Sequence, residues 1–313
     1  MLYFTESDVR RLLPMQDAIR LMREAFTKLA SGAAQNQPRR RLILPTGSVL
    51  HYMPAADDRY FGIKVYSTHR KHGAHFFFLL FRAEDGQPLA MFEANFLGQI
   101  RTGAVSGLAT DLLARADAAT LAIIGSGFQA RSQLDAMRAV REFRSVRAWS
   151  RSAEKRAAFA AECNVEAVET AEAAVRGADI VITATNSKDP VLEADWVAPG
   201  AHVNAMGSNQ AARRELPAEL LERAGVIVVD SLEQSKMESG DLLLAWKSEQ
   251  WLDQRLVELK DVATGKVPGR QDPNQITLFK SNGLALEDVA TGGYIYERGL
   301  EAGIGRSMAP LYS

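Results

Sequence analysis

Hydrophobic positions follow two different patterns along the chain. Over residues 15–31 apolar side chains recur every three or four positions, which predicts an amphipathic helix that begins after Pro14 and ends at Gly32. Turn-like segments separate the short runs that follow, so these runs predict an antiparallel sheet. They are rich in aromatic and aliphatic residues and occupy residues 41–44, 50–53, 62–66, 75–81 and 89–92. Another helix is expected over about residues 102–114.

After residue 119 short apolar runs alternate with helical stretches. The runs occupy residues 121–124, 146–149, 180–183, 202–206 and 225–230. Such alternation is typical of βαβ units, which build a parallel sheet with helices on both faces. We therefore expect an α/β protein. Residues 116–293 would form a doubly wound Rossmann domain, and residues 1–115, completed by 294–313, would form a second domain.

Composition narrows the class of protein. The chain has 313 residues, more than one ordinary core holds, and its 37 basic and 38 acidic residues nearly cancel, which argues against a nucleic-acid partner. One cysteine, Cys163, excludes an internal disulfide and a cysteine-cluster metal site. No apolar run approaches the roughly 20 residues that span a bilayer, and the start does not resemble a secretory signal. A soluble, cytoplasmic protein without a membrane partner is expected.

The most informative local motif stands between a predicted strand and a predicted helix. It reads Gly125-Ser126-Gly127-Phe128-Gln129-Ala130. In this context the first glycine permits a tight turn, and the second lets the backbone approach a pyrophosphate. A small residue at position 130 allows close packing of helix on strand, and the anion lies at the positive end of the helix. The motif therefore predicts a dinucleotide site rather than a purely structural turn.

The residues after the second strand of this domain bear on which dinucleotide binds. An NAD site usually has a carboxylate about 20 residues beyond the glycines, where it binds the ribose hydroxyls. Here the strand ends at Trp149 and continues Ser150, Arg151, Ser152. An arginine between two hydroxyls suits a 2′-phosphate, so NADP(H) is favoured and NAD(H) is the alternative. The competing interpretation makes Arg151 a solvated loop residue.

Three cations outside this domain are candidates for binding an anion. Lys64 lies within an apolar strand pattern, Arg101 opens a helix and Arg41 opens a strand. A cation buried among apolar neighbours is costly unless it is paired, so an anionic partner is expected. For each cation alone, a surface salt bridge is the alternative.

Motifs along nearly the whole chain resemble the ornithine cyclodeaminase/mu-crystallin family. They are Gln37-Pro38 followed by arginines, Met53-Pro54-Ala55, Lys64, Leu97-Gly98-Gln99-Ile100-Arg101-Thr102-Gly103-Ala104, the Gly125–Ala130 segment, and Asn204-Ala205-Met206-Gly207-Ser208. The resemblance implies a Rossmann domain paired with a mixed α/β domain that binds substrate and dimerises. A homodimer is therefore expected.

The resemblance also implies roles for single residues. Arg41, Lys64 and Arg101 are similar to the residues that hold the substrate carboxylate, with Arg40 fitting nearly as well as Arg41. Arg213 falls where cyclodeaminases have a lysine near the substrate. Five positions match cofactor contacts of the family: Arg101, Thr102, Thr185, Met206 and Gly283.

One departure from the family pattern bears on the reaction. Cyclodeaminases have an aspartate after a Gly-Gly or Gly-Ser pair, whereas this chain has Asn209 after Gly207 and Ser208. An amide is not a base. We therefore expect that the site contains no carboxylate that could accept a proton. Hydride delivery to a ready-made C=N bond does not need one. The hypothesis is an NAD(P)H-dependent reductase of cyclic imino acids, of the pyrroline-2-carboxylate or piperideine-2-carboxylate type, that gives L-proline or L-pipecolate.

In this hypothesis Lys64 polarises or protonates the imine and Asn209 orients the ring nitrogen or a water molecule. The alternatives are an alanine-type amino-acid dehydrogenase, an ornithine cyclodeaminase and, in another class, a non-catalytic NADPH-dependent protein that binds a small ligand. No metal site is expected, because His69, His72 and His75 lie in a basic turn without carboxylates. Asp230, after an apolar run, is either catalytic or a cap for the next helix.

Overall fold

The computed structural model describes residues 1–308, and the chain divides into two compact units. Unit 1 holds residues 1–101 and those from Leu284 onward, and unit 2 holds Thr102–Gly283. These boundaries differ from those expected at residues 115 and 293. The helix α3 (Asn95–Leu113) begins in unit 1 and ends in unit 2 without a loop, and α11 (Ala285–Ala302) lies wholly in unit 1. Neither of the two boundaries between the units along the chain therefore coincides with a polar linker.

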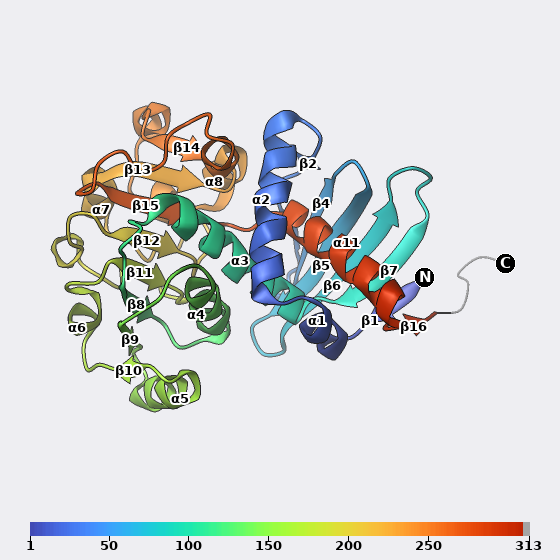
Figure 1. The fold of residues 1–313 in the computed structure, drawn as a ribbon, viewed down its shortest axis with the longest axis horizontal. Helices are drawn as coiled ribbons and strands as arrows, with labels where there is room; N and C mark the ends of the chain where they lie inside the picture. The colour runs from blue at the N-terminus through green and yellow to red at the C-terminus, as the bar shows by residue number, and fades with distance from the viewer. Residues whose placement is uncertain (309–313) are drawn as a thin grey trace. The chain divides into compact units, whose positions relative to one another are not determined.

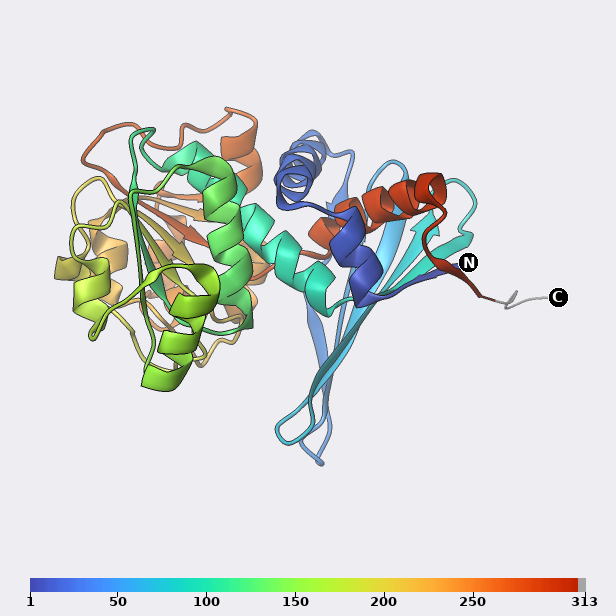
Figure 2. The same ribbon diagram turned by 60° about the horizontal axis from the view of Figure 1, so that its bottom comes forward.

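Unit 1 contains an eight-stranded sheet of order β16-β1-β7-β6-β5-β4-β2, with β3 paired to β4. All its pairs are antiparallel except β1 with β7, so the sheet expected from the sequence is confirmed. The strands are β1 (Leu2–Phe4), β2 (Gln35–Asn36), β3 (Arg40–Ile43), β4 (Val49–Ala56), β5 (Tyr60–His69), β6 (Gly73–Arg82), β7 (Pro88–Glu93) and β16 (Arg306–Ser307). In Figure 2 the hairpins of this sheet project beyond its helices.

Helices cover one face of this sheet. Thr5 caps α1 (Glu6–Leu12) in a capping box with Asp8, and α2 (Met15–Ser31) ends at Gly32, which has a left-handed φ of 81°. The bounds predicted for the helix over residues 15–31 are thus confirmed. The helix α11 packs on α2 and on β4 to β6 (Figure 1). It approaches closely, because a Cβ on Gly292 would lie 2.6 Å from the ring of Phe78.

Alternation along the strands separates two faces of the sheet. On β5 the side chains of Lys64 and Tyr66 are buried on the face that α11 covers. The opposite face carries large apolar side chains that are 36–55% exposed. They lie on four strands, β3 to β6, and are Leu42, Leu50, Tyr52, Phe61 and Phe77. Unit 1 therefore has an uncovered apolar sheet face.

Unit 2 is a parallel sheet of order β10-β9-β8-β11-β12-β15-β13-β14. The strands are β8 (Thr120–Ile124), β9 (Ser145–Trp149), β10 (Glu166–Ala167), β11 (Ile180–Thr183), β12 (His202–Ala205), β13 (Ala224–Val229), β14 (Leu256–Glu258) and β15 (Ile276–Lys280). The chain moves outward from β8 to β10 and then returns to β11 on the other side of β8. This reversal is the switch point of a Rossmann sheet, at whose carboxyl edge ligands bind.

Helices connect these strands, as the alternating pattern predicts (Figure 1). They are α4 (Phe128–Val140), α5 (Ala153–Cys163), α6 (Ala171–Val175), α7 (Ala218–Arg223), α8 (Leu232–Glu238), α9 (Gly240–Leu243) and α10 (Leu259–Ala263), with 3₁₀ turns at Ala194–Trp196 and Ser248–Leu252. The core of the unit gathers aliphatic side chains of the strands, such as Val181, Val203 and Ile227. Within residues 1–308, no helix has an apolar stretch long enough to cross a membrane.

Candidate active site

The glycine motif of unit 2 forms a tight turn from β8 into α4. Gly125 has a φ of 123°, in the region that favours glycine, and its N–H donates to the carbonyl of Trp149 at 2.8 Å. A Cβ at this position would lie 2.4 Å from the carbonyl oxygen of Ala184. The turn thus requires glycine at position 125, both for its backbone angle and for the close approach of β11.

The start of α4 has the features of an anion cradle. Gly127 is the N-cap residue, makes no side-chain capping bond, and has open space where a Cβ would stand. The first N–H groups of this 13-residue helix therefore receive no cap from that residue. Ala130 is fully buried, while Phe128 is half exposed and Gln129 half buried at the rim. This geometry leaves the start of α4 open at the place where the motif predicts a pyrophosphate.

Thr102 joins α3 to α4, the helix that follows this turn. Its carbonyl oxygen accepts a hydrogen bond from Nε2 of Gln133 at 3.1 Å. The two helices approach so closely that a Cβ on Gly103 would lie 2.3 Å from the carbonyl oxygen of Ser132. Thr102 is nearly buried, so its main contribution here is to fix the helix that carries the turn.

The segment after β9 carries no carboxylate in its first three residues. Oγ of Ser126 donates to Oγ of Ser150 at 2.8 Å, which ties this segment to the glycine turn. Ser152 caps α5 by accepting from the N–H of Lys155. Arg151 is exposed between them. Arg151 therefore follows directly on the end of β9, the strand end at which Rossmann folds bind the adenosine ribose.

Buried carboxylates hold the remaining loops at this edge of the sheet. Oδ2 of Asp230, after β13, accepts from Oγ of Ser281 at 3.0 Å and from the N–H groups of Asn282 and Gly283 at 2.6 Å each. Burial raises the pKa of Asp230, and these donors oppose the rise. The cap of α8 is Ser231. The interpretation of Asp230 as the cap of this helix is therefore wrong, and its carboxylate instead fixes the loop that contains Gly283.

The loops after β11 and β12 contain the other predicted residues of unit 2. Thr185 is half buried, Met206 is 8% exposed and Asn209 is half buried. Arg213, which also follows β12, contacts the loop after β11, because its Nη1 donates to the carbonyl of Asn186 at 2.8 Å. These four residues thus belong to neighbouring loops of the carboxyl edge.

Two predicted cations meet in the interior of unit 1. Lys64 is 2% exposed, and its Nζ donates to Oδ1 of Asp288 at 2.7 Å. Nη1 of Arg101 donates to Oε2 of Glu287 at 2.6 Å, and its Nε lies 3.6 Å from Oδ2 of Asp288. The expectation of an anionic partner is confirmed for both cations. The expectation of a site without carboxylates is wrong, because two acids of α11 stand beside them.

The surroundings of Lys64 set its charge. Burial lowers its pKa to about 8; Asp288 opposes this change, and Arg101 and Arg39 add to it. Burial also acts against the charge of Arg101, but Asp288 and Glu287 raise its pKa overall. Lys64 can therefore gain or lose a proton near neutral pH, whereas Arg101 stays charged.

The three arginines before β4 have different places. Arg41 stands opposite His51 in the β3–β4 ladder, on the same sheet face as Lys64, and it is exposed. Arg40 is one residue removed and faces the other way. Arg39 is 3% exposed and lowers the pKa of Lys64. Of the three arginines, Arg39 is therefore the one in the interior, whereas the sequence analysis considered only Arg40 and Arg41 for the substrate carboxylate.

An aromatic stack continues the face on which Lys64 lies. The rings of His51 and Tyr66 stack at 4.2 Å, and Phe76 stacks on Tyr66 at 4.6 Å. Burial, with help from Arg41 and Arg39, lowers the pKa of His51 to about 4, so this imidazole is neutral at neutral pH. Its Nε2 bonds Oγ1 of Thr68 at 3.0 Å.

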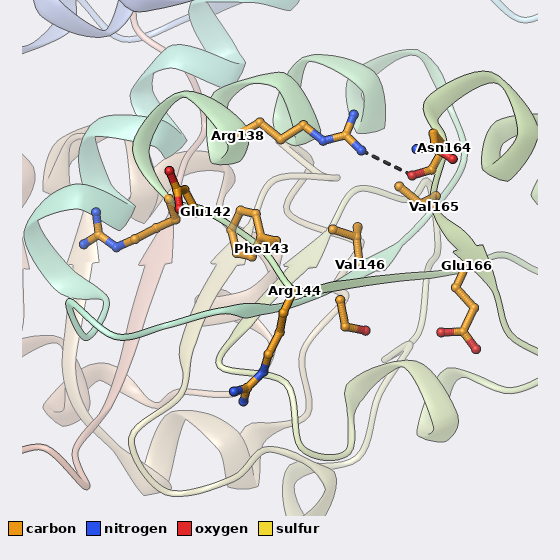
Figure 3. A pocket seen from close by; sticks show the side chains of 10 residues that line it. Arg138, Glu142, Phe143, Arg144, Val146, Asn164, Val165 and Glu166 are labelled. Atoms are coloured by element: carbon orange, nitrogen blue, oxygen red, sulfur yellow. Dashed lines mark hydrogen bonds between the residues drawn. The ribbon is translucent and has the colours of Figure 1, made fainter.

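Two other features of the described chain do not build a site. Figure 3 shows a shallow pocket beside Val146, near the amino end of β9, opposite the edge that carries the glycine turn. Its Arg138 reaches toward Asn164 while Arg144 points elsewhere, so the arginines do not converge on one ligand. Among residues 1–308, no three His, Cys, Asp or Glu side chains are grouped to hold a metal ion.

Comparisons with known proteins agree on one family. The model of the ornithine cyclodeaminase/mu-crystallin family matches residues 2–303. Over 230 residues the chain is 40% identical to a Delta(1)-pyrroline-2-carboxylate reductase of Bacillus cereus, which covers 71% of this chain and 70% of that protein.

Two solved structures extend the likeness to the fold. The Thermococcus litoralis Delta(1)-pyrroline-2-carboxylate reductase in complex with NADH and L-proline matches with a TM-score of 0.92 and 33% identity, over 98% of this chain and 100% of that one. An archaeal alanine dehydrogenase dimer with bound NAD gives 0.92 and 33%, over 99% of each chain. This chain therefore belongs to the ornithine cyclodeaminase/mu-crystallin family.

Proposed function

We propose that this protein is an NADPH-dependent reductase of cyclic 2-imino acids, which converts a substrate such as pyrroline-2-carboxylate or piperideine-2-carboxylate into the L-amino acid. The observation that carries the proposal is the buried cluster of Lys64 and Arg101 with Asp288 and Glu287. A related reductase binds NADH and L-proline, which is the product of such a reaction.

Lys64 and Arg101 would bind the substrate carboxylate, with Arg39 and Arg41 adding positive charge. A guanidinium has five N–H donors and an ammonium has three, so the ion pairs with Glu287 and Asp288 leave donors for a ligand. The acids also hold both cations in one orientation, which reduces the entropy lost when the substrate binds. The carboxylate would thus enter a site whose geometry already exists.

Lys64 would supply the proton to the imine nitrogen. An iminium carbon accepts hydride better than a neutral imine, and a group with a pKa of about 8 is protonated at neutral pH yet able to release its proton. Asp288 would hold the ammonium in place, and after the transfer Lys64 would regain a proton from water. We assign Asn209 to orienting the ring nitrogen or a water molecule, since its amide cannot act as a base.

The bound nucleotide supplies the hydride, and unit 2 would hold it in place. Gly125, Gly127 and the start of α4 suit the pyrophosphate. We favour NADPH over NADH because Arg151 is exposed at the end of β9 and can form a charge-assisted bond with a 2′-phosphate. In the same proposal Thr185, Met206 and Gly283 contact the nicotinamide end, and Arg213 lies toward the substrate.

A second candidate is an alanine-type dehydrogenase, which the likeness to the archaeal alanine dehydrogenase favours. That reaction must lose or add water and ammonia at a keto acid, so it needs a proton acceptor. Asn209 cannot serve and Asp288 is engaged with Lys64, so Lys64 would have to be the acceptor, although its pKa of about 8 leaves it mostly protonated at neutral pH. The reductase is therefore the stronger proposal.

We also propose that the partner of this chain is a second copy. The uncovered sheet face of unit 1 exposes Tyr52, Phe61 and Phe77 at 36–40%, and exposed apolar faces of this kind mark interaction surfaces. The archaeal relative is described as a dimer. Pairing of this face between two copies would remove that surface from water.

The test compares substrates under identical conditions. NADPH or NADH oxidation is followed at its absorbance maximum with pyrroline-2-carboxylate and with pyruvate plus ammonium, and release of ammonia from ornithine is measured separately in the presence of the oxidised nucleotide. The proposal predicts consumption with the cyclic imine, faster with NADPH, and formation of L-proline on chiral chromatography. Consumption only with pyruvate and ammonium, or release of ammonia from ornithine, would contradict it.

A further inference from the structure

Glu215 is a buried carboxylate at the carboxyl edge of the unit 2 sheet, and none of the roles above uses it. It is 0% exposed. Its Oε1 accepts from the N–H and Oγ1 of Thr185 at 2.6 Å each. Its Oε2 accepts from Oγ1 of Thr183 at 2.9 Å and from the N–H of Gly207 at 2.7 Å. One side chain therefore joins the ends of β11 and β12.

A second buried pair extends this network to β15. Oδ1 of Asp241 accepts from the N–H groups of Glu215 and Leu216 at 2.6 and 3.0 Å. Its Oδ2 lies 3.0 Å from Nζ of Lys280, which donates to the carbonyl of Ser208 at 2.6 Å. Glu215, Asp241 and Lys280 thus form a continuous set of contacts among three loops.

The fit around Glu215 leaves little freedom. A Cβ on Gly207 would lie 2.2 Å from the carbonyl oxygen of Thr185 and 2.3 Å from Oε1 of Glu215. Burial raises the pKa of Glu215, and the nearby Asp241 adds to the rise, so the carboxylate is costly to keep there. Its partners are loop atoms at one edge of the sheet. This indicates that the hydrogen bonds of the buried carboxylate stabilise those loops and offset the cost of its burial.

We propose that Glu215 is a positioning residue that holds Thr185 and Gly207 in the arrangement required by the nicotinamide end of the cofactor. This inference rests on the proposed function, because it takes Thr185 and the neighbouring Met206 as cofactor contacts. Glu215 acts through these residues and touches no reacting atom. The Asp241–Lys280 pair supports it from the side of β15.

The variant Glu215→Gln tests this role with almost no change in volume. The carboxylate accepts four hydrogen bonds, whereas an amide has one acceptor oxygen and an NH₂ that only donates. The hydroxyl of Thr183 can rotate, but the N–H of Gly207 cannot. The amide oxygen can replace only one of the two carboxylate oxygens, so the N–H of Gly207 or that of Thr185 loses its acceptor. The loop then moves, and the cofactor contacts move with it.

Asp179→Asn is the matched control. Oδ2 of Asp179 also binds loop backbone, accepting from the N–H groups of Ala119 and Thr120 at 3.0 Å each. It does so beside the first residue of β8, at the amino edge of the same sheet. Both substitutions therefore remove a charge that holds backbone N–H groups, but only Glu215→Gln does so beside the proposed cofactor loops.

The experiment measures the NADPH dissociation constant by fluorescence, the thermal midpoint without cofactor, and the deuterium isotope effect with 4-deuterated NADPH. Both variants should lower the midpoint. Glu215→Gln should raise the dissociation constant about tenfold, as expected when one buried bond to a charged group is lost, and should raise the isotope effect. Asp179→Asn should leave both unchanged.

Equal dissociation constants and isotope effects in the two variants, at similar thermal midpoints, would overturn the inference alone. Failure of the wild type to bind either nucleotide would overturn the proposed function and the inference with it. If Glu215→Gln does not fold, Thr183→Val provides the second variant. It removes one buried donor to Glu215 at constant shape and should weaken NADPH binding in the same direction, and unchanged binding would again overturn the role.

Discussion

Replacing Asp288 by asparagine removes the charge partner of a lysine that is almost completely buried. A buried ion pair that loses one member usually costs about 3–5 kcal/mol, because the other charge stays unpaired. Lys64 can avoid this cost by releasing its proton, since its pKa is already lowered from 10.5 to about 8. At pH 7 the charged lysine is then favoured over the neutral amine by only about 1 kcal/mol.

The loss of stability through Lys64 in Asp288→Asn should therefore stop near this value at pH 7, because the amine releases its proton instead. The pKa of Lys64 lies below its ordinary value, so the lysine contributes to the ion pair only below about pH 8. The penalty should accordingly rise toward about 3 kcal/mol at pH 6 and vanish near pH 9.

Urea unfolding followed by circular dichroism at pH 6, 7 and 9 measures this penalty. Glu301→Gln is the control, because Glu301 makes an exposed ion pair with Arg298 on the same helix, and such pairs contribute about 0–1 kcal/mol. A penalty for Asp288→Asn that stays constant from pH 6 to 9 would refute the coupling between Asp288 and the charge of Lys64.

Three further predictions concern the reaction, the cofactor and the assembly. Reduction should slow above about pH 8 while oxidation of the amino acid speeds up, because reduction needs a protonated Lys64 and oxidation a neutral one; pH profiles in both directions check this. Arg151→Ala should raise the dissociation constant of NADPH about tenfold and leave that of NADH unchanged, in a binding titration with both nucleotides. Phe77→Glu places a charge on the uncovered sheet face and should convert a dimer into monomers in light scattering, whereas a mass equal to that of the wild type would contradict the assigned face.

The pattern of apolar positions was enough to predict both sheets, and the glycine motif was enough to predict the turn between β8 and α4. Strands can be recognised from local periodicity. Gly125 can be recognised from a motif in which the backbone angle and the close packing require glycine. The short strands β10 and β14 and the strand β15 were not expected. The first two have two and three residues, too few for a periodicity to show.

Long-range pairing explains what the sequence leaves open at the site. Asp288 lies 224 residues from Lys64, and Glu287 lies 186 residues from Arg101, so no local spacing connects them. Their one sequence clue is a pair of acids in the first turn of a helix, next to the apolar residues Leu286 and Val289, where burial demands cations. Arg39 was missed because three adjacent arginines look alike until the strand register separates them.

The most direct measurement of the central claim is the turnover of Lys64→Met with pyrroline-2-carboxylate and NADPH, set beside its affinity for NADPH. Methionine keeps the length of the side chain and removes its charge and proton. We predict that the rate falls about 100-fold or more, as for the loss of a general acid, while the NADPH dissociation constant stays that of the wild type. Full turnover in this variant would contradict the account.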